Sequence, residues 1–236
     1  MTAEGPWYTD AERLARVIDA VRAVQPGLVL HRGDGAPVLG GEFLVREGEE
    51  VLDRYTIEIE LARESEQGLP AVREVGGRIP RTEDRHVSHD GSLCVVQPAA
   101  YWFHRPQGLP LAEFLEGPVR SHLAMQSIVE GGEGWLIGEW AHGAAGVAEF
   151  FAEMLGITAP AAVCELVGVI AGERMKGHRP CPCGCGRKFR KCHGPVVFNA
   201  QRNIPLNVRL ESYSMVRTIA GDDGKPLRMH ESDRGR

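Results

Sequence analysis

The sequence contains no long apolar run and no apolar segment near its first residues. None of its stretches approaches the roughly 18 consecutive apolar residues that span a bilayer. The first ten residues, Met-Thr-Ala-Glu-Gly-Pro-Trp-Tyr-Thr-Asp, also lack the basic start and apolar core of an export signal. We therefore expect a cytoplasmic protein with no membrane partner.

Cysteine is scarce through the first 160 residues, where Cys94 stands alone, and dense near the other end. Four of the six cysteines fall within 12 residues, at Cys181, Cys183, Cys185 and Cys192. Such a cluster is more typical of a metal site in a reducing compartment than of a disulfide framework.

Apolar residues make up 43% of the chain and charged residues 25%, which is typical of a folded globular protein. The formal net charge is −5, yet residues 173–193 hold seven lysines and arginines against one acidic residue. Arg187, Lys188, Arg190 and Lys191 could contact phosphates, with Phe189 stacking on a base. The same charges also keep a small motif soluble, so nucleic acid is not the partner we expect.

The pattern at the start of the chain predicts a helix over about 15 residues. Thr9-Asp-Ala-Glu12 has the form of a capping box, in which Thr9 caps the first turn. Apolar residues then recur at helical spacing until Pro26-Gly27 ends the helix; they are Leu14, Val17, Ile18, Val21 and Val24.

Four short strands are expected next, at 28–30, 43–45, 55–61 and 69–72, with 33–41 as a turn-rich connection. In the clearest of them, apolar residues from Tyr55 to Leu61 alternate with polar ones. This two-residue period predicts an antiparallel sheet with one buried and one solvated face.

Residues 78–110 have no strong periodicity and are expected to form a long loop, which is usually functional in a compact domain. Helices are expected at 111–115, 119–129, 144–155 and 161–175. Cys164 lies in the last of them and is expected to be a core residue. The predicted fold class is therefore α+β: an N-terminal helix, a four-stranded antiparallel meander, an active-site loop, C-terminal helices and a small zinc knuckle. The polar end, 221–236, is expected to be disordered.

The loop from Arg78 to Val95 contains the candidate nucleophile. Cys94 follows a dense set of proton-handling side chains (Asp84, His86, His89 and Asp90) and the turn-forming Gly91. A thiol is a useful nucleophile when nearby donors favour its thiolate and it stays reachable. On composition alone the opposite interpretation has more weight, because a single cysteine beside Leu93 and Val95 is usually a core residue. His142 is expected to be structural.

Residues 181–194 read Cys-Pro-Cys-Gly-Cys-Gly-Arg-Lys-Phe-Arg-Lys-Cys-His-Gly. Cys181 and Cys183 can share a metal ion, and Cys192-His193 can complete a closed tetrahedral set, as in a structural zinc site. Cys185 is a fifth candidate, so these residues alone leave the choice of four ligands open.

This segment resembles the SEC-C zinc motif, which ends the translocation motor SecA and is appended to many bacterial proteins. The resemblance implies Cys181, Cys183, Cys192 and His193 as ligands of a structural Zn²⁺. The motif usually has serine where Cys185 stands, so Cys185 is left out of the set.

The longer first part resembles the ubiquitin-conjugating (UBC) fold, in particular its divergent bacterial members. The third predicted strand and Gly68-Leu-Pro-Ala-Val72 are similar to its third strand and the entry to its fourth. Gly91-Ser-Leu-Cys94 is similar to its active-site turn, and His86 stands where eukaryotic members have an asparagine. The corresponding division is 1–158 for the UBC-like domain, 159–178 for a connecting helix, 179–196 for the SEC-C motif and 197–236 for a tail.

The resemblance implies an acyl transferase in which Cys94 carries a ubiquitin-like protein as a thioester, received from an activating enzyme and passed to a lysine of a protein target. A donor near the tetrahedral oxygen is required, and His86 is the candidate. Such bacterial proteins occur in antiphage defence operons, which is the implied setting. The alternatives are a catalytically silent binding protein of the same fold and a Cys/His hydrolase such as a peptidase.

Overall fold

The computed structural model describes residues 5–31, 35–63, 65–88, 90–135, 141 and 143–220. They form two compact units, Met1–Val96 with Gln107–Leu136, and Gln97–Pro106 with Ile137–Arg236. The sequence-based division differs, because it assigned 97–106 and 143–155 to the first domain. The α+β class, the N-terminal helix and the four-stranded antiparallel sheet are confirmed.

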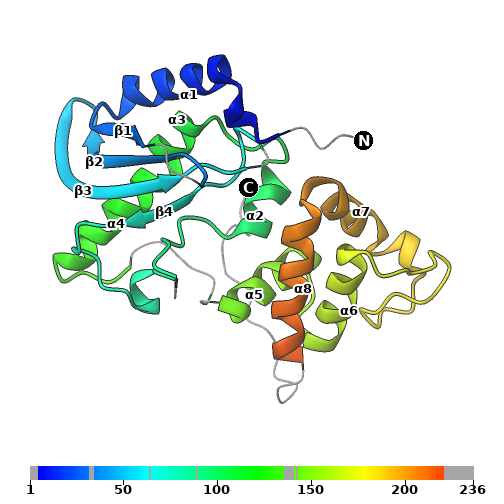
Figure 1. The fold of residues 1–236 in the computed structure, drawn as a ribbon. Helices are drawn as coiled ribbons and strands as arrows, with labels where there is room; N and C mark the ends of the chain where they lie inside the picture. Colours follow the sequence, from blue (N-terminus) through cyan, green and yellow to red (C-terminus); the bar gives the residue numbers. More distant parts are fainter. Residues whose placement is uncertain are drawn as a thin grey trace. The chain divides into compact units, whose positions relative to one another are not determined.

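The first unit is built on an antiparallel meander in the order β1-β2-β3-β4 (Figure 1). The strands are β1 (Leu28–His31), β2 (Val38–Glu47), β3 (Glu50–Glu60) and β4 (Ala71–Glu74). On β3 the predicted alternation holds, since Tyr55, Ile57 and Ile59 are buried and the residues between them are exposed. The apolar face of the sheet therefore belongs to the core.

β2 begins five residues before the predicted strand, within the expected connection. Gly41 is paired with Leu28 and has a φ of 141°. A side chain there would place its Cβ 2.1 Å from the carbonyl oxygen of Gly27. The glycine that suggested a turn is thus required by the close approach of two strands.

Helices pack against this sheet. After the short turn η1 (Trp7–Thr9), α1 (Ala11–Val24) begins one residue later than predicted, because the carboxylate of Asp10 accepts from the N–H groups of Glu12 and Arg13. The prediction that Thr9 caps this helix was wrong, because the Thr9 hydroxyl donates to the carbonyl of Pro6. Further on, α3 (Leu111–Phe114), the π-helical segment η3 (Leu115–Val119) and α4 (Arg120–Glu130) follow one another directly, and α4 packs on β2 and β3.

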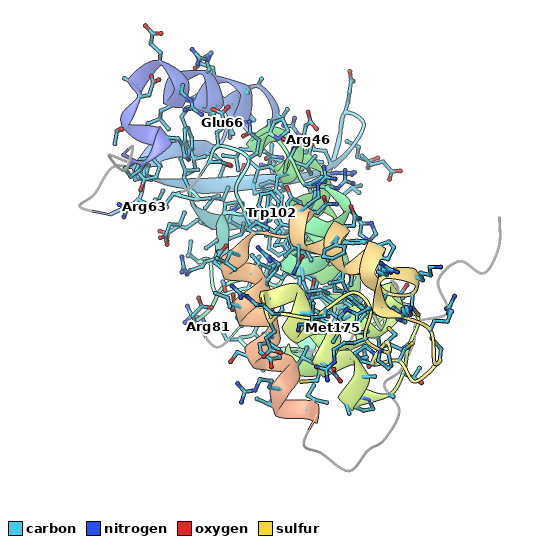
Figure 2. The ribbon with its side chains drawn as sticks, turned by 90° about the vertical axis from the view of Figure 1, so that its right-hand side faces the viewer. Arg46, Arg63, Glu66, Arg81, Trp102 and Met175 are labelled. Atoms are coloured by element: carbon cyan, nitrogen blue, oxygen red, sulfur yellow. The ribbon has the colours of Figure 1, made fainter. Side chains whose placement is uncertain are left out.

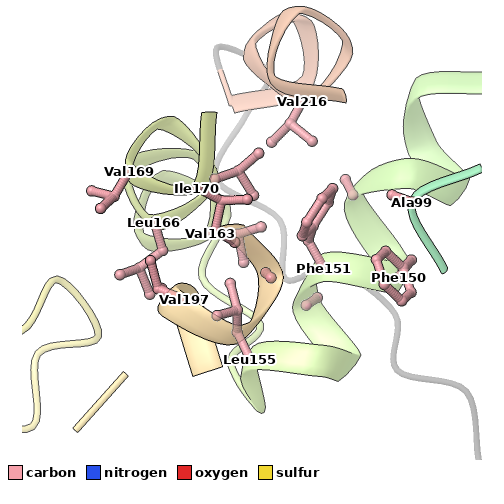
Figure 3. Close-up of a cluster of buried hydrophobic side chains, with 14 of the residues drawn as sticks. Ala99, Phe150, Phe151, Leu155, Val163, Leu166, Val169, Ile170, Val197 and Val216 are labelled. Carbon is pink, nitrogen blue, oxygen red and sulfur yellow. The ribbon is translucent and has the colours of Figure 1, made fainter. Parts of the chain in front are cut away.

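The second unit is helical, with a core shared by α5 (Gly143–Leu155), α6 (Pro160–Ala171), α7 (Gly194–Asn203) and α8 (Leu206–Ala220) (Figure 3). α6 ends at Ala171, four residues before the predicted end, and its C-cap Gly172 has a φ of 120°. Within the predicted loop, α2 (Pro98–His104) begins where Gln97 caps the helix, and it adds Ala99 to this core. The expected tail contains most of α7 and all of α8, and residues 221–236 lie outside the described residues.

In the described part of the chain, no single helix has the length and hydropathy of a membrane span. α5 and α6 together reach that length and composition, but the pair is bent by 85°.

Candidate functional site

The segment that ends at Cys94 forms a small hairpin along the free side of β4. The N–H of Leu93 donates to the carbonyl of Val72 over 2.7 Å, and Ser92 bridges to Arg73. The hairpin turns at Gly91, whose φ of 82° is accessible to glycine at little cost. Since side chains alternate along an extended segment, burial of Leu93 directs the next side chain outward. Cys94 is exposed, which excludes the core-residue interpretation.

Two neighbours fix the position of Cys94. Its N–H donates to the carbonyl of His86 over 2.7 Å, and its Sγ lies 3.1 Å from the hydroxyl oxygen of Ser88. The first bond brings the backbones of the two predicted site residues together. In the described part of the chain, Ser88 is the hydrogen-bonding partner of the sulfur.

The His86 side chain lies in an aromatic group. Its φ is 52°, an uncommon value for a residue other than glycine. The imidazole centroid lies 4.2 Å from a ring centroid of Trp135 and 6.2 Å from that of His122. The carbonyl of His86 thus holds Cys94 while its ring is held by aromatic neighbours. His89 and His142 lie outside the described residues.

Hydrogen bonds from Arg85 through Gln126 determine the protonation state of His122. Arginine can only donate, so the bond from Arg85 Nε to Gln126 identifies the accepting atom as the amide oxygen. The amide nitrogen of Gln126 then donates to the carbonyl of Arg85 and lies 3.1 Å from His122 Nε2. That ring nitrogen must accept, so His122 is neutral. Burial, and then the nearby charge of His86, lower the pKa of His122 from 6.5 to about 3.

The start of the loop is attached to the sheet through an arginine. The guanidinium of Arg78 makes two bonds of 2.6 Å to the carboxylate of Asp53 and a third to Glu130, and it lies 4.3 Å above the ring of Tyr55. The hydrogen bond from Arg78 lowers the pKa of Asp53 from 3.8 to about 2, so the pair stays ionised in the neutral range. This pair fixes one end of the loop.

Far along the chain, the second unit brings Cys181, Cys183, Cys192 and His193 together. Their ligand atoms all lie within 4.8 Å of one another. The Nδ1 atom of His193 is 3.1 Å from the sulfur of Cys181, and the sulfurs of Cys183 and Cys192 are 3.6 Å apart. Tetrahedral zinc, with bonds of about 2.0–2.3 Å, needs ligand atoms roughly 3.5–3.8 Å apart. The separations lie around these values, with the Cys181–His193 pair somewhat closer, so the four residues could hold one metal ion.

Neighbouring groups favour the metal-binding forms of two of these residues, His193 and Cys181. The Nε2 atom of His193 lies 2.8 Å from the carbonyl oxygen of Leu155, which can only accept, so the proton is on Nε2 and Nδ1 is free for a metal. Burial alone raises the pKa of the Cys181 thiol, but hydrogen bonds from the N–H groups of Cys183 and His193 outweigh it and bring the pKa to about 7. These two effects favour the ligating forms of His193 and Cys181, whereas burial raises the pKa of the Cys183 thiol and raises that of Cys192 to about 12.

Cys185 lies outside this group of four. It is exposed, although its sulfur is 3.4 Å from that of Cys192. Phe189 is fully buried in the core of the unit, so its ring is not available to stack on a base. A buried ring gives the knuckle a hydrophobic anchor in addition to any metal.

The part of the site that sequence reasoning missed is the group formed by His122, Gln126 and Trp135. His122 and Gln126 are four residues apart on α4, the spacing at which side chains share a helix face. Both are buried, and a polar pair on a buried helix face is the signal that could have identified them.

Comparisons with known proteins bear on the cysteine cluster. A stretch of 26 residues is 54% identical to protein translocase subunit SecA of Solibacter usitatus (strain Ellin6076). It covers 11% of this chain and 3% of that SecA, so the chain spans only a small part of its curated relative. No family model and no solved structure matches the chain. The SecA match and the Cys₃His group together support a SEC-C-type metal-binding motif.

Proposed function

We propose that the first unit is a ubiquitin-conjugating-type carrier that holds a ubiquitin-like protein as a thioester on Cys94. The observation that supports this most is the outward side chain of Cys94, which follows the buried Leu93 on a hairpin fixed to β4. A carrier cysteine must meet two large protein partners, so an exposed sulfur on a fixed backbone suits the task.

The proposed reaction has two steps. In loading, the sulfur of Cys94 attacks the carbonyl carbon of the ubiquitin-like protein's C-terminus, and the bond from that carbon to the activating enzyme's sulfur breaks. That sulfur leaves as a thiolate and takes up the proton that Cys94 lost. In transfer, the amine of a target lysine attacks the thioester, an amide forms, and Cys94 is regenerated as a thiol.

We assign His86 the role of donor to the tetrahedral oxygen. Its position supports the role in two ways. The bond from the Cys94 N–H to the His86 carbonyl keeps the two residues adjacent, and the rings of Trp135 and His122 hold the imidazole. Because His122 accepts from Gln126 and is neutral, it adds no positive charge beside the imidazole of His86.

For the second unit we propose a structural Zn²⁺ on Cys181, Cys183, Cys192 and His193. Three thiolates and one imidazole are typical zinc ligands, and a full set of four leaves no open position for catalysis. Such an ion would stabilise the fold of 172–193, a segment with little regular secondary structure. We further propose a cytoplasmic protein, with antiphage defence as the setting.

The alternatives have less support. A Cys/His hydrolase needs an imidazole hydrogen-bonded to the nucleophile, whereas the described partner of Cys94 Sγ is the hydroxyl of Ser88. A silent binding protein does not need an exposed cysteine at this turn, so exposure of Cys94 does not favour it.

The proposal is tested by co-expressing the protein with its genomic neighbours, among which it predicts an activating enzyme and a ubiquitin-like protein. Intact mass should rise by the mass of one ubiquitin-like protein, and dithiothreitol should reverse the change. Cys94→Ser should give an adduct that resists dithiothreitol, because an oxyester is less easily exchanged by thiols. Cys185→Ser, at a second exposed cysteine, is the matched control and should load normally.

A further inference from the structure

One stretch of the second unit carries charge of a single sign. Residues 174–210 include nine lysines and arginines and no aspartate or glutamate. Because the whole protein has a negative net charge, a cationic stretch of this length is a candidate site for a polyanion.

These cations are almost all available. The salt bridges recorded for the described residues use none of the nine. Two are engaged otherwise: Arg187 donates to the sulfur of Cys192, and Arg209 donates to the carbonyl of Ile170. The other seven are exposed: Arg174, Lys176, Arg179, Lys188, Arg190, Lys191 and Arg202. Figure 2 shows nitrogen-tipped side chains around the yellow segment that follows Met175.

The backbone brings the cations of two segments together. The N–H of Phe189 donates to the carbonyl of Arg179, that of Arg190 donates to Gly177, and Lys188 bridges to Pro180. Residues 176–180 and 188–190 therefore run side by side. The backbone thus holds the positions of these cationic residues close to one another.

An exposed aromatic ring lies next to this surface. Phe198 on α7 is 53% exposed, and its centroid is 6.2 Å from that of the buried Phe189. Arg202 follows it by four residues, on the same helix face. We call Lys176, Arg179, Lys188, Arg190, Lys191, Phe198 and Arg202 the knuckle surface.

We propose that the knuckle surface binds single-stranded nucleic acid, with phosphates on the cations and a base on the ring of Phe198. A surface made for acidic peptides needs cations but no exposed ring, whereas single-strand binders combine a positive groove with an aromatic platform. The arginines add planar donor groups that match phosphate oxygens. The ring that the sequence offered for stacking, Phe189, is buried, whereas the neighbouring ring of Phe198 is exposed. This proposal does not depend on the carrier function of Cys94.

The test uses the full-length, zinc-loaded protein and fluorescent oligo(U) and oligo(dT) strands of about 12 nucleotides, followed by anisotropy. Affinity should fall steeply between about 50 and 200 mM salt, with a slope near −0.7 for each phosphate contacted. The two strands show whether RNA or DNA is preferred. A polyglutamate of equal charge and anionic lipid vesicles serve as competitors. The proposal would be overturned if polyglutamate or vesicles displaced the labelled strand as effectively as unlabelled strand does.

Variants separate the surface from net charge and from the fold. The double variant Lys188→Gln/Arg190→Gln should reduce the steepness of the log affinity against log salt plot by about 1.4. The control Arg16→Gln/Arg22→Gln removes the same charge from α1 and should leave that slope unchanged. Phe198→Ala and Phe198→Leu should both weaken binding about tenfold or more, because leucine keeps the apolar surface but not the ring. Zinc content and helicity confirm that each variant is folded. Full binding by Phe198→Leu, or equal losses in the two charge pairs, would contradict the assignment.

Discussion

The backbone N–H of Cys94 donates to the carbonyl oxygen of His86 over 2.7 Å, and this bond closes a hairpin of eight residue steps. Inside it, Val87 bridges to Leu93, and both side chains are buried. The hairpin thereby holds the candidate nucleophile and the candidate oxyanion donor next to each other through the main chain. Their relative position is a property of the fold and does not depend on a side-chain contact between them.

Gly91 should be essential to this hairpin. Gly91→Ala puts a side chain at a φ of 82°, where an L-residue is strained, and we expect a loss of about 1–2 kcal/mol in the free energy of unfolding. The iodoacetamide reaction rate of Cys94 should also change. Gly117→Ala is the control, because Gly117 has a negative φ and open space around it. Equal unfolding midpoints in urea for the two variants would contradict the role of the turn.

His122 should make the stability of the first unit depend on pH. Its folded pKa of about 3 lies below the ordinary 6.5, so unfolding is accompanied by proton uptake between those values. The stabilisation is therefore complete above pH 6.5 and is lost as the pH falls towards 3, by about 1.4 kcal/mol per pH unit. Chemical denaturation at pH 7.0, 6.0 and 5.0 measures the slope.

The matched variant is His122→Asn, which keeps a hydrogen-bonding group and does not titrate in this range. It should be less stable than the parent at pH 7 and lose less stability on acidification from 6.5 to 5. Parallel pH profiles for parent and variant would show that another group is responsible.

Substitution of a metal ligand should affect metal binding differently from substitution of Cys185. Cys181→Ser should lose the bound metal and the native structure of 172–193, because unfolded metal-free segments are typical of small zinc motifs. Cys185→Ser should keep one zinc per chain. Metal analysis after gel filtration, with circular dichroism, gives both readings, and loss of zinc from Cys185→Ser would show that the ligand set includes the fifth cysteine.

Much of the fold followed from local pattern. The alternation along β3 and the helical spacing of α1 are direct consequences of one buried face, and both were predicted. α2 was missed because its seven residues are too few for a recognisable period, and β2 was shortened because Gly40 and Gly41 imitate a turn. The helices α7 and α8 went unpredicted, although Val197 and Val216 lie in the core.

The metal site and the Cys94 site also differ in how far the sequence alone predicts them. The four metal ligands fall within 13 residues, so spacing alone could bring them together. Cys94 could be singled out but not oriented, because its exposure depends on the hairpin pairing with β4. His122 and Trp135 join His86 only through tertiary structure. Local spacing predicts a site when all its residues are neighbours in the chain.

The central claim is that the sulfur of Cys94 carries the acyl group, and peptide mass spectrometry of the loaded, unreduced protein tests it most directly. The account predicts one cross-linked peptide, in which the C-terminal residue of the ubiquitin-like protein is joined to the peptide containing Cys94. That species should disappear after treatment with hydroxylamine and be missing from Cys94→Ala. A thioester found on Cys185, or an adduct that persists at full level in Cys94→Ala, would contradict the account.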